Sequence, residues 1–226
     1  MLPALTCESL TCVRPQWNES GLAQVRDVTA SFPPGTLTGF HGPGGCGKGL
    51  LLNILGLLEP PDSGRIRIQE HPALGLPAEE ARQLRNEAFG FLFDQPCLLP
   101  SFSVAENVAM PLFRICGGDA QTARLRTLEV LDFCGIAQHE CTLVGRLDPA
   151  DQRRACLARA LVHRPGILIA ISPRGAARLI PLLRLAAHQT GLCVLWAGER
   201  NELAPHADRL IEMRDGRITE DIPTNA

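Results

Sequence analysis

The chain has 226 residues, of which 45% are hydrophobic, and carries a formal net charge of −2. This length and apolar content predict one α/β domain with a sizeable core, and the lack of a basic surplus argues against nucleic acid as a partner. Because no apolar run approaches the roughly 20 residues of a membrane-spanning helix, any membrane role is expected to come through a partner protein.

Short β-like runs lead into a glycine-rich turn within the first fifty residues. Alternating apolar residues predict strands over Ala4–Val13, Gln24–Ser31 and Leu37–His41. The glycine-rich turn follows the third run directly, and a helix is predicted from Lys48 to Leu58, before Pro60-Pro61. The order is therefore strand, glycine-rich loop and helix.

Strands and helices continue to alternate along the rest of the chain, and residues 103–163 are mainly helical. We expect further strands over Arg65–Gln69, Phe89–Phe93, Ile167–Ile171, Leu192–Trp196, Asp208–Met213 and Arg217–Thr219. We expect helices over Pro77–Glu87, from Asp119 to Cys134, from Asp148 to before Pro165, and over Ala176–Gln189. This alternation predicts a largely parallel sheet.

The glycine-rich turn fits G-x-x-x-x-G-K, a loop whose backbone N–H groups surround nucleotide phosphates. Its residues are Gly42, Pro43, Gly44, Gly45, Cys46, Gly47 and Lys48, followed by Gly49. Lys48 is the only lysine among 22 basic residues, which favours a retained phosphate contact over chance survival in an arginine-biased composition. A Ser or Thr normally follows this lysine to hold Mg²⁺, and Gly49 has no hydroxyl. The loop therefore predicts a nucleotide site that lacks part of its metal chemistry.

Metal-binding residue types show no ligand spacing elsewhere. The nine cysteines include no Cys-x-x-Cys pair, and the six histidines form no spaced cluster. We predict no metal site from these side chains, and we expect the cysteines to act as small buried hydrophobes.

The order of these segments resembles the ATPase subunits of ABC transporters, and most of all the subgroup that serves lipoprotein-releasing, macrolide-export and cell-division permeases. The matching segments are Gly42–Gly64 (GPGGCGKGLLLNILGLLEPPDSG), Phe91–Pro100 (FLFDQPCLLP), Val104–Leu112 (VAENVAMPL), Gln152–Pro165 (QRRACLARALVHRP) and Ala207–Ile218 (ADRLIEMRDGRI).

The resemblance implies an α/β P-loop NTPase fold of the ABC type, with a mainly parallel sheet, an N-terminal antiparallel β part and a helical subdomain. It further implies one ABC ATPase-like domain over residues 1–226. Residues 1–93 and 164–226 would form the nucleotide-binding core, and residues from about 94 to 163 the Q-loop-like region and the helical subdomain.

The reactive positions of the family are occupied by other residue types. The family holds Mg²⁺ with a loop Ser, a Gln and an Asp, and these positions correspond to Gly49, Asp94 and Ile171. Asp94 could supply one oxygen, with Gln95 as its substitute only if the loop shifts register, or the two are an ordinary exposed loop pair; Gly49 and Ile171 supply no oxygen. Ser172 stands in place of the Glu that activates water, and a neutral serine is a poor base.

Three more contacts of the family are changed. The switch histidine corresponds to Gly198, and the Asp of the loop that links two subunits corresponds to Arg178. The aromatic residue that stacks on adenine falls at Val13-Arg14, where Arg14 either stacks its guanidinium on the base or is an ordinary surface residue. No catalytic residue is therefore assigned.

The family signature Leu-Ser-Gly-Gly-Gln reads Leu147-Asp148-Pro149-Ala150-Asp151 in this chain. Asp148 is a strong N-cap, Pro149 suits the first helical position and lacks an N–H, and Asp151 adds a negative charge to the first turn. A phosphate arriving there would be repelled by about 4 kcal/mol at 4 Å and an effective dielectric constant near 20. We interpret this segment as a structural cap, and we interpret Arg153, Arg154 and Arg159 behind it as a solvated helix face.

These substitutions predict a degenerate ATPase subunit, with ATP binding weak or absent and Mg²⁺ binding doubtful. Its expected partners are integral-membrane permease subunits, docked through the Asp94–Leu112 region, and a second ATPase subunit, homologous or identical. It would lie peripherally on the cytoplasmic face of the inner (plasma) membrane and have a structural or regulatory role. One alternative is an active ATPase in which Asp94 binds metal and Glu199 or a partner residue orients water. Another is a soluble binding module that uses the apolar Phe91–Phe102 loop.

Overall fold

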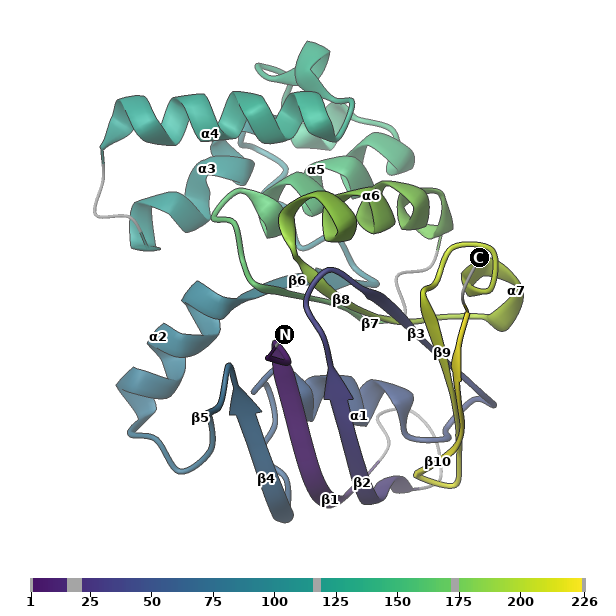
Figure 1. The fold of residues 1–226 in the computed structure, drawn as a ribbon. Helices are drawn as coiled ribbons and strands as arrows, with labels where there is room; N and C mark the ends of the chain where they lie inside the picture. The colour runs from purple at the N-terminus through teal and green to yellow at the C-terminus, as the bar shows by residue number, and fades with distance from the viewer. Residues whose placement is uncertain (1, 16–21, 116–118, 172–174, 225–226) are drawn as a thin grey trace.

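The computed structural model describes residues 2–15, 22–115, 119–171 and 175–224. Two β-sheets form the framework of the molecule (Figure 1). The antiparallel sheet has the order β2-β1-β4-β5 and consists of β1 (Leu5–Pro15), β2 (Leu22–Phe32), β4 (Ser63–Ile68) and β5 (His71–Pro72). The second sheet has the order β10-β9-β3-β8-β7-β6 and consists of β3 (Leu37–His41), β6 (Phe89–Phe93), β7 (Ile167–Ile171), β8 (Cys193–Ala197), β9 (Arg209–Arg214) and β10 (Arg217–Pro223).

Helix α1 (Lys48–Leu55) lies between the two sheets (Figure 1). Its leucine and isoleucine side chains are buried together with apolar residues of both sheets, such as Leu10 of β1 and Leu195 of β8. Burial of such side chains contributes about 1.5–3 kcal/mol each, so this core fixes the start of α1 relative to the strand ends around it.

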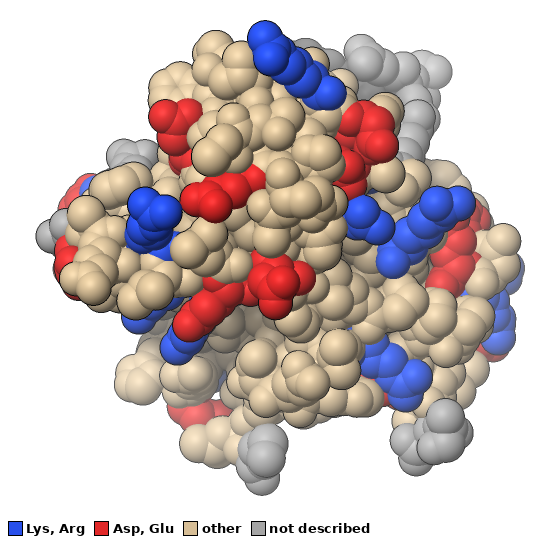
Figure 2. All heavy atoms as spheres, turned by 90° about the horizontal axis from the view of Figure 1, so that it is seen from above, with Lys and Arg blue, Asp and Glu red and all other residues tan. Residues whose placement is uncertain are grey.

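Helices cover the opposite face of the larger sheet (Figure 1). They are α3 (Val104–Ile115), α4 (Ala120–Phe133), α5 (Pro149–Leu161) and α6 (Ile180–Thr190). Helix α2 (Ala78–Ala88) contacts the edge strand β6, and the short α7 (Arg200–Leu203) follows β8. Seen from above, this side of the molecule carries basic and acidic side chains interspersed among wide uncharged areas (Figure 2).

The predicted sheet arrangement is confirmed. Strands β9, β3, β8, β7 and β6 pair in parallel, and β10 returns antiparallel to β9. The hairpin turn between β9 and β10, at Asp215-Gly216, has φ angles of 47° and 79°, so both residues adopt the left-handed conformation that such a turn requires.

Two helix boundaries differ from the prediction. Helix α1 ends at Leu55 instead of Leu58, because Gly56 caps it and Leu57 turns left-handed with φ 56°. The helix predicted over Ala176–Gln189 begins as a 3₁₀ turn at Ala177–Leu179 and becomes α-helical only at Ile180. Pro181 explains this start, since proline lacks an N–H and suits only the first turn of an α-helix.

In the described part of the chain, none of the helices combines the length and the apolarity that crossing a bilayer would require.

Candidate nucleotide-binding site

The glycine-rich loop connects β3 to α1 and passes between β2 and β9. Gly42 has φ 140°, and a Cβ atom on it would lie 2.1 Å from the carbonyl oxygen of Met213. Gly47 has φ 98°, and its Cβ would lie 2.1 Å from the carbonyl oxygen of Gln24. Both positions therefore need glycine for conformation and for space.

Lys48 folds back onto the loop that it ends. Its Nζ donates hydrogen bonds to the carbonyl oxygens of Gly42, at 2.6 Å, and Pro43, at 3.0 Å, and lies 3.5 Å from Sγ of Cys46. A phosphate that binds Lys48 would exchange these neutral acceptors for a charged one, which makes a stronger hydrogen bond.

A cavity of about 620 Å³ opens beside the loop. Its lining comes from the loop and the start of α1, from the end of β8 and the start of α7, and from one residue each of β2 and of the segment before α6. The residues are Ala23, Gly42, Gly44, Gly45, Cys46, Gly47, Lys48, Gly49, Leu50, Gly175, Trp196, Ala197, Gly198, Glu199 and Glu202. The loop residues and the N-terminus of α1, which no side chain caps, are the parts that can hold phosphate. Among the described residues, the lining contains one ammonium, on Lys48, and two carboxylates, on Glu199 and Glu202.

Three strand ends meet at the edge of the sheet near the cavity. Phe93 pairs with Ile171, and Ile171 pairs with Ala197. Gly198 continues β8, and its N–H donates to the carbonyl oxygen of Phe40 at 3.0 Å, which places it beside the strand that enters the loop.

The start of α5 is closed by the side chain of Asp148. Its Oδ1 accepts a hydrogen bond from the backbone N–H of Asp151 at 2.8 Å, and Pro149 occupies the first turn, as the sequence predicts. Asp151 is itself paired, with Nη1 of Arg154 at 2.9 Å and Nε2 of His139 at 3.4 Å. The first turn of α5 thus holds two carboxylates of the chain itself.

Comparison with known proteins identifies the family to which this fold belongs. The family model described as ABC transporter matches residues 25–173. The lipoprotein-releasing system ATP-binding protein LolD of Bordetella pertussis is 36% identical, over 97% of this chain and 96% of its own length.

The chain belongs to the ABC transporter family.

Two further relatives support this assignment. The pyoverdine export ATP-binding/permease protein PvdT of Pseudomonas aeruginosa is 34% identical, over 92% of this chain but only 33% of its own length. The dimeric structure of MJ0796, a bacterial ABC transporter cassette, matches with a TM-score of 0.86 and 25% identity, over 98% of this chain and 99% of that one. The predicted ABC-type α/β fold is therefore confirmed, and the chain is an ATP-binding subunit of this family.

Of the three residues that the resemblance assigns to the family's metal positions, only Gly49 lines the cavity, and its side chain offers no oxygen ligand. Neither Asp94 nor Ile171 lines the cavity, and Ile171 packs against the core between the sheets. Gly49 lines the cavity, and a Cβ on it would meet no atom within 4 Å, so packing does not forbid a serine there. Among the described residues, no three His, Cys, Asp or Glu side chains are grouped to hold a metal ion. Ser172, at the position of the base, lies outside the described residues.

Arg14 is engaged away from the cavity. Its guanidinium contacts Oε1 of Glu59 at 2.7 Å, Oδ1 of Asp62 at 2.6 Å, and the carbonyl oxygens of Val13 and Pro60. The hydrogen bond from Arg14 lowers the pKa of Asp62, helped by the Val13 N–H. These contacts speak against stacking of Arg14 on a base. Arg178 is exposed in the 3₁₀ turn before α6 and does not line the cavity either.

The prediction that Arg153 and Arg159 form a solvated face is wrong. Arg153 donates to the carbonyl oxygen of Asp94 at 3.2 Å, and Arg159 donates to those of Cys97, at 2.6 Å, and Pro96, at 3.0 Å. These α5 side chains therefore fasten the segment that follows β6. The expectation that the cysteines are buried is also wrong for Cys97 and Cys141, which are exposed.

A groove of about 600 Å³ lies between β6 and α3. Phe89, Phe91 and Phe93 line it and stack along β6, with ring centroids 5.8 and 5.6 Å apart. Met110 and Phe113 of α3 form the facing wall, and 59% of the Phe113 surface is exposed. The sequence singled out this region through its apolar residues, but not through the strand spacing that aligns the three rings.

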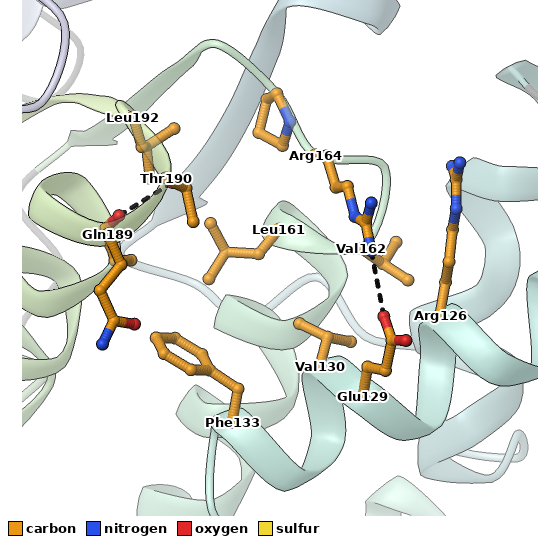
Figure 3. A pocket seen from close by; sticks show the side chains of 12 residues that line it. Arg126, Glu129, Val130, Phe133, Leu161, Val162, Arg164, Gln189, Thr190 and Leu192 are labelled. Atoms are coloured by element: carbon orange, nitrogen blue, oxygen red, sulfur yellow. Dashed lines mark hydrogen bonds and ion pairs between the residues drawn. The ribbon is translucent and has the colours of Figure 1, made fainter.

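A third cavity, of about 470 Å³, separates α4 and the end of α5 from the end of α6 (Figure 3). Phe133, Leu161 and Leu192 form its apolar part, and an ion pair between Arg164 and Glu129, at 3.1 Å, lies at one side. None of the predicted site residues lines this cavity.

Proposed function

We propose that this chain is a degenerate, non-hydrolysing ATP-binding subunit of an ABC transporter-like membrane complex. It has a structural or regulatory role beside permease subunits, and a second ATPase subunit supplies the energy. Its phosphate loop keeps a weak grip on nucleotide, without a Mg²⁺ site of the family type.

The observation that carries this proposal is the self-capped start of α5. ABC subunits of the usual type use the N–H groups of this helix start to bind the γ-phosphate of the opposite subunit. Asp148 occupies one of these N–H groups, and Pro149 removes another. Because the carboxylates of Asp148 and Asp151 would repel a phosphate, the helix supports its own stability instead of a partner's catalysis.

The phosphate-loop side supports the same conclusion. Gly49 and Ile171 offer no oxygen ligand, and Gly198 offers no side chain to a terminal phosphate. Both faults, in the signature and in the metal and base positions, occur in one chain. If it pairs with a normal subunit, both shared nucleotide sites are impaired, and losses of this kind act together rather than independently.

Turnover measurements test the proposal directly. Steady-state ATP hydrolysis is measured for the purified chain and for its membrane complex, each with and without Lys48→Ala in this chain alone. We expect no hydrolysis by the purified chain, and turnover of the complex within about twofold of wild type, because Lys48 holds no hydrolysed nucleotide. Loss of turnover on Lys48→Ala would overturn the proposal.

The groove between β6 and α3 is the surface that we assign to the permease. Its aromatic wall and the exposed Phe113 suit an apolar segment of a membrane subunit. Of its lining, Met110 and Pro111 belong to the predicted Asp94–Leu112 region, and Phe93 and Phe113 flank that region. Phe113→Asp is expected to reduce recovery of the chain with membranes at least tenfold, because it places a charge in an apolar contact. Leu185→Asp, at an exposed leucine of α6, is the matched control and should leave recovery unchanged. Equal recovery of both variants would contradict this docking site. A chain docked in this way would lie peripherally on the cytoplasmic face of the inner membrane.

We further propose that residues from about 94 to 163 form a helical subdomain on a core of residues 1–93 and 164–226. The third cavity supports this division, because α4 and α5 line one side of it and α6 the other (Figure 3). The ion pair between Glu129 and Arg164 crosses the same boundary.

A second candidate is an active ATPase with displaced chemistry, because the carboxylate of Glu199 lines the cavity beside Lys48. It predicts Mg²⁺-dependent turnover that is lost in Glu199→Gln, whereas the degenerate subunit has no turnover to lose.

A further inference from the structure

Trp196 places a large aromatic ring at the wall of the phosphate cavity. Only 1% of its surface is exposed, and it is the penultimate residue of β8. It lines the same cavity as Ala197, Gly198 and the loop residues. An indole is apolar except for its N–H, so the direction of that N–H decides what the ring can contribute.

The indole N–H is on the side of Gly198. A Cβ atom on Gly198 would lie 3.0 Å from Nε1 of Trp196 and 3.2 Å from its Cδ1. A glycine at this position therefore leaves the N–H edge of the ring uncovered. Any longer side chain, including the histidine that the family places here, would press against the indole.

The N–H has no acceptor in residues 2–15, 22–115, 119–171 and 175–224. In the part of the chain that the structure describes, the buried side-chain atoms without a hydrogen-bond partner are on Thr38, His163 and Arg184 and do not include this N–H. An N–H that has no acceptor among the described residues, on a residue that lines a cavity, is suited to bind an acceptor that enters the cavity.

We propose that the indole N–H of Trp196 donates a hydrogen bond to a phosphate oxygen of the ligand held by Gly42–Lys48. Trp196 thereby takes over, as a neutral donor, the place left by the missing side chain at position 198. This inference rests on the phosphate-binding part of the proposed function. The bond from the Gly198 N–H to the carbonyl oxygen of Phe40 holds the end of β8 beside the strand that enters the loop.

The charges that line the cavity make a neutral donor important for phosphate affinity. Among the described residues of the lining, Lys48 is the one cationic side chain, and Glu199 and Glu202 carry negative charges. Hydrogen bonds to charged groups contribute enough to change affinity by about 10- to 100-fold. A neutral N–H adds such a bond without itself forming an ion pair with either carboxylate.

Affinity for pyrophosphate, which has no base, tests the proposal. Equilibrium dialysis with labelled pyrophosphate compares the wild type with Trp196→Phe, which keeps a ring and removes the N–H, and with Gly198→Ala, which covers the N–H and keeps the indole. We expect both variants to bind pyrophosphate about tenfold or more weakly. Trp17→Phe makes the same chemical change at the other tryptophan of the sequence and is expected to leave this affinity unchanged. Thermal unfolding of each variant shows that it is folded.

Fluorescence gives a second readout. In the Trp17→Phe background Trp196 is the sole tryptophan, and its emission should change on adding pyrophosphate or ATP, but not after Lys48→Ala. ADP is titrated in parallel, and a smaller change than with ATP would place the contact at the terminal phosphate.

The outcomes separate this inference from the proposed function. If Trp196→Phe and Gly198→Ala both bind within twofold of wild type, the role of Trp196 is wrong while the loop remains a phosphate site. If the wild type binds no pyrophosphate, the inference also fails, but a non-hydrolysing subunit on a permease still stands. Turnover that depends on Lys48 would overturn the proposed function and leave the Trp196 contact to be judged by binding alone.

Discussion

ABC subunits of the usual type bind phosphate at the helix starts that correspond to those of α1 and α5. In this chain the first turns of these two helices are built in opposite ways. Helix α1 starts at Gly47 with no side-chain cap and no acidic residue in its first turn. Helix α5 starts at Asp148, whose carboxylate caps the helix, with Pro149 and Asp151 behind it. The N–H groups of a helix start attract an anion only if the chain has not supplied one itself. In this protein the start of α1 is therefore left without a side-chain cap, whereas the start of α5 is occupied by a carboxylate of the chain itself.

The largest effect on stability is expected at the start of α1, the helix that no side chain caps. Gly47→Ala forces a Cβ to within 2.1 Å of a carbonyl oxygen at a φ of 98°, and we expect it to lower the free energy of unfolding by about 3 kcal/mol or more. Urea unfolding measures the change. Gly44→Ala is the matched control, since its Cβ would meet no atom within 4 Å. A stable Gly47→Ala protein would mean that the loop does not need this geometry.

A smaller effect is expected at the closed end. Asp148→Ala removes the cap of α5 and should lower the free energy of unfolding by about 1 kcal/mol. Asp148→Asn keeps a capping oxygen without the charge, so it should retain most of the stability. The same urea experiment compares the two. Equal losses in both variants would show that charge, rather than capping, is what Asp148 contributes.

The smallest effect is expected on ATP affinity, from a substitution at the start of α1. Gly49→Ser adds a hydroxyl where no atom lies within 4 Å of the new Cβ, and we expect ATP binding to become a few-fold tighter with Mg²⁺ than without it. Gly49→Ala adds the Cβ without the hydroxyl and should show no such dependence. Dialysis of labelled ATP with Mg²⁺ or with a chelator measures both variants. Hydrolysis should stay absent, because the other catalytic positions are unchanged; if the serine alone restored turnover, the degenerate interpretation would be wrong.

Local rules predicted much of both helix starts. The glycine spacing predicted the loop, and the pair Asp148-Pro149 predicted the cap, because both depend on neighbours within a few residues. The parallel strand order also followed from the alternation of strands and helices. The positions from Arg14 to Gly198 were assigned by resemblance, which names a role but gives no contact.

Contacts between distant segments could not be predicted in the same way. Arg159 reaches carbonyl oxygens more than 60 residues away along the chain, and a backbone carbonyl leaves no mark in the sequence. Arg14 was open to two interpretations until Glu59 and Asp62 were placed beside it. The position of the Trp196 indole next to Gly198 depends on the twist and register of β8, so it can be seen only in the folded sheet.

The lone ammonium of Lys48 has a consequence for chemical labelling. Any side-chain amine–thiol pair in these 226 residues must include Lys48, and its Nζ lies 3.5 Å from the sulfur of Cys46. A dialdehyde that condenses with an adjacent amine and thiol to a fluorescent isoindole would therefore mark the phosphate loop selectively. A ligand that draws Lys48 away from Cys46 would protect the loop from this reagent, so the protein carries its own occupancy probe without an engineered tag.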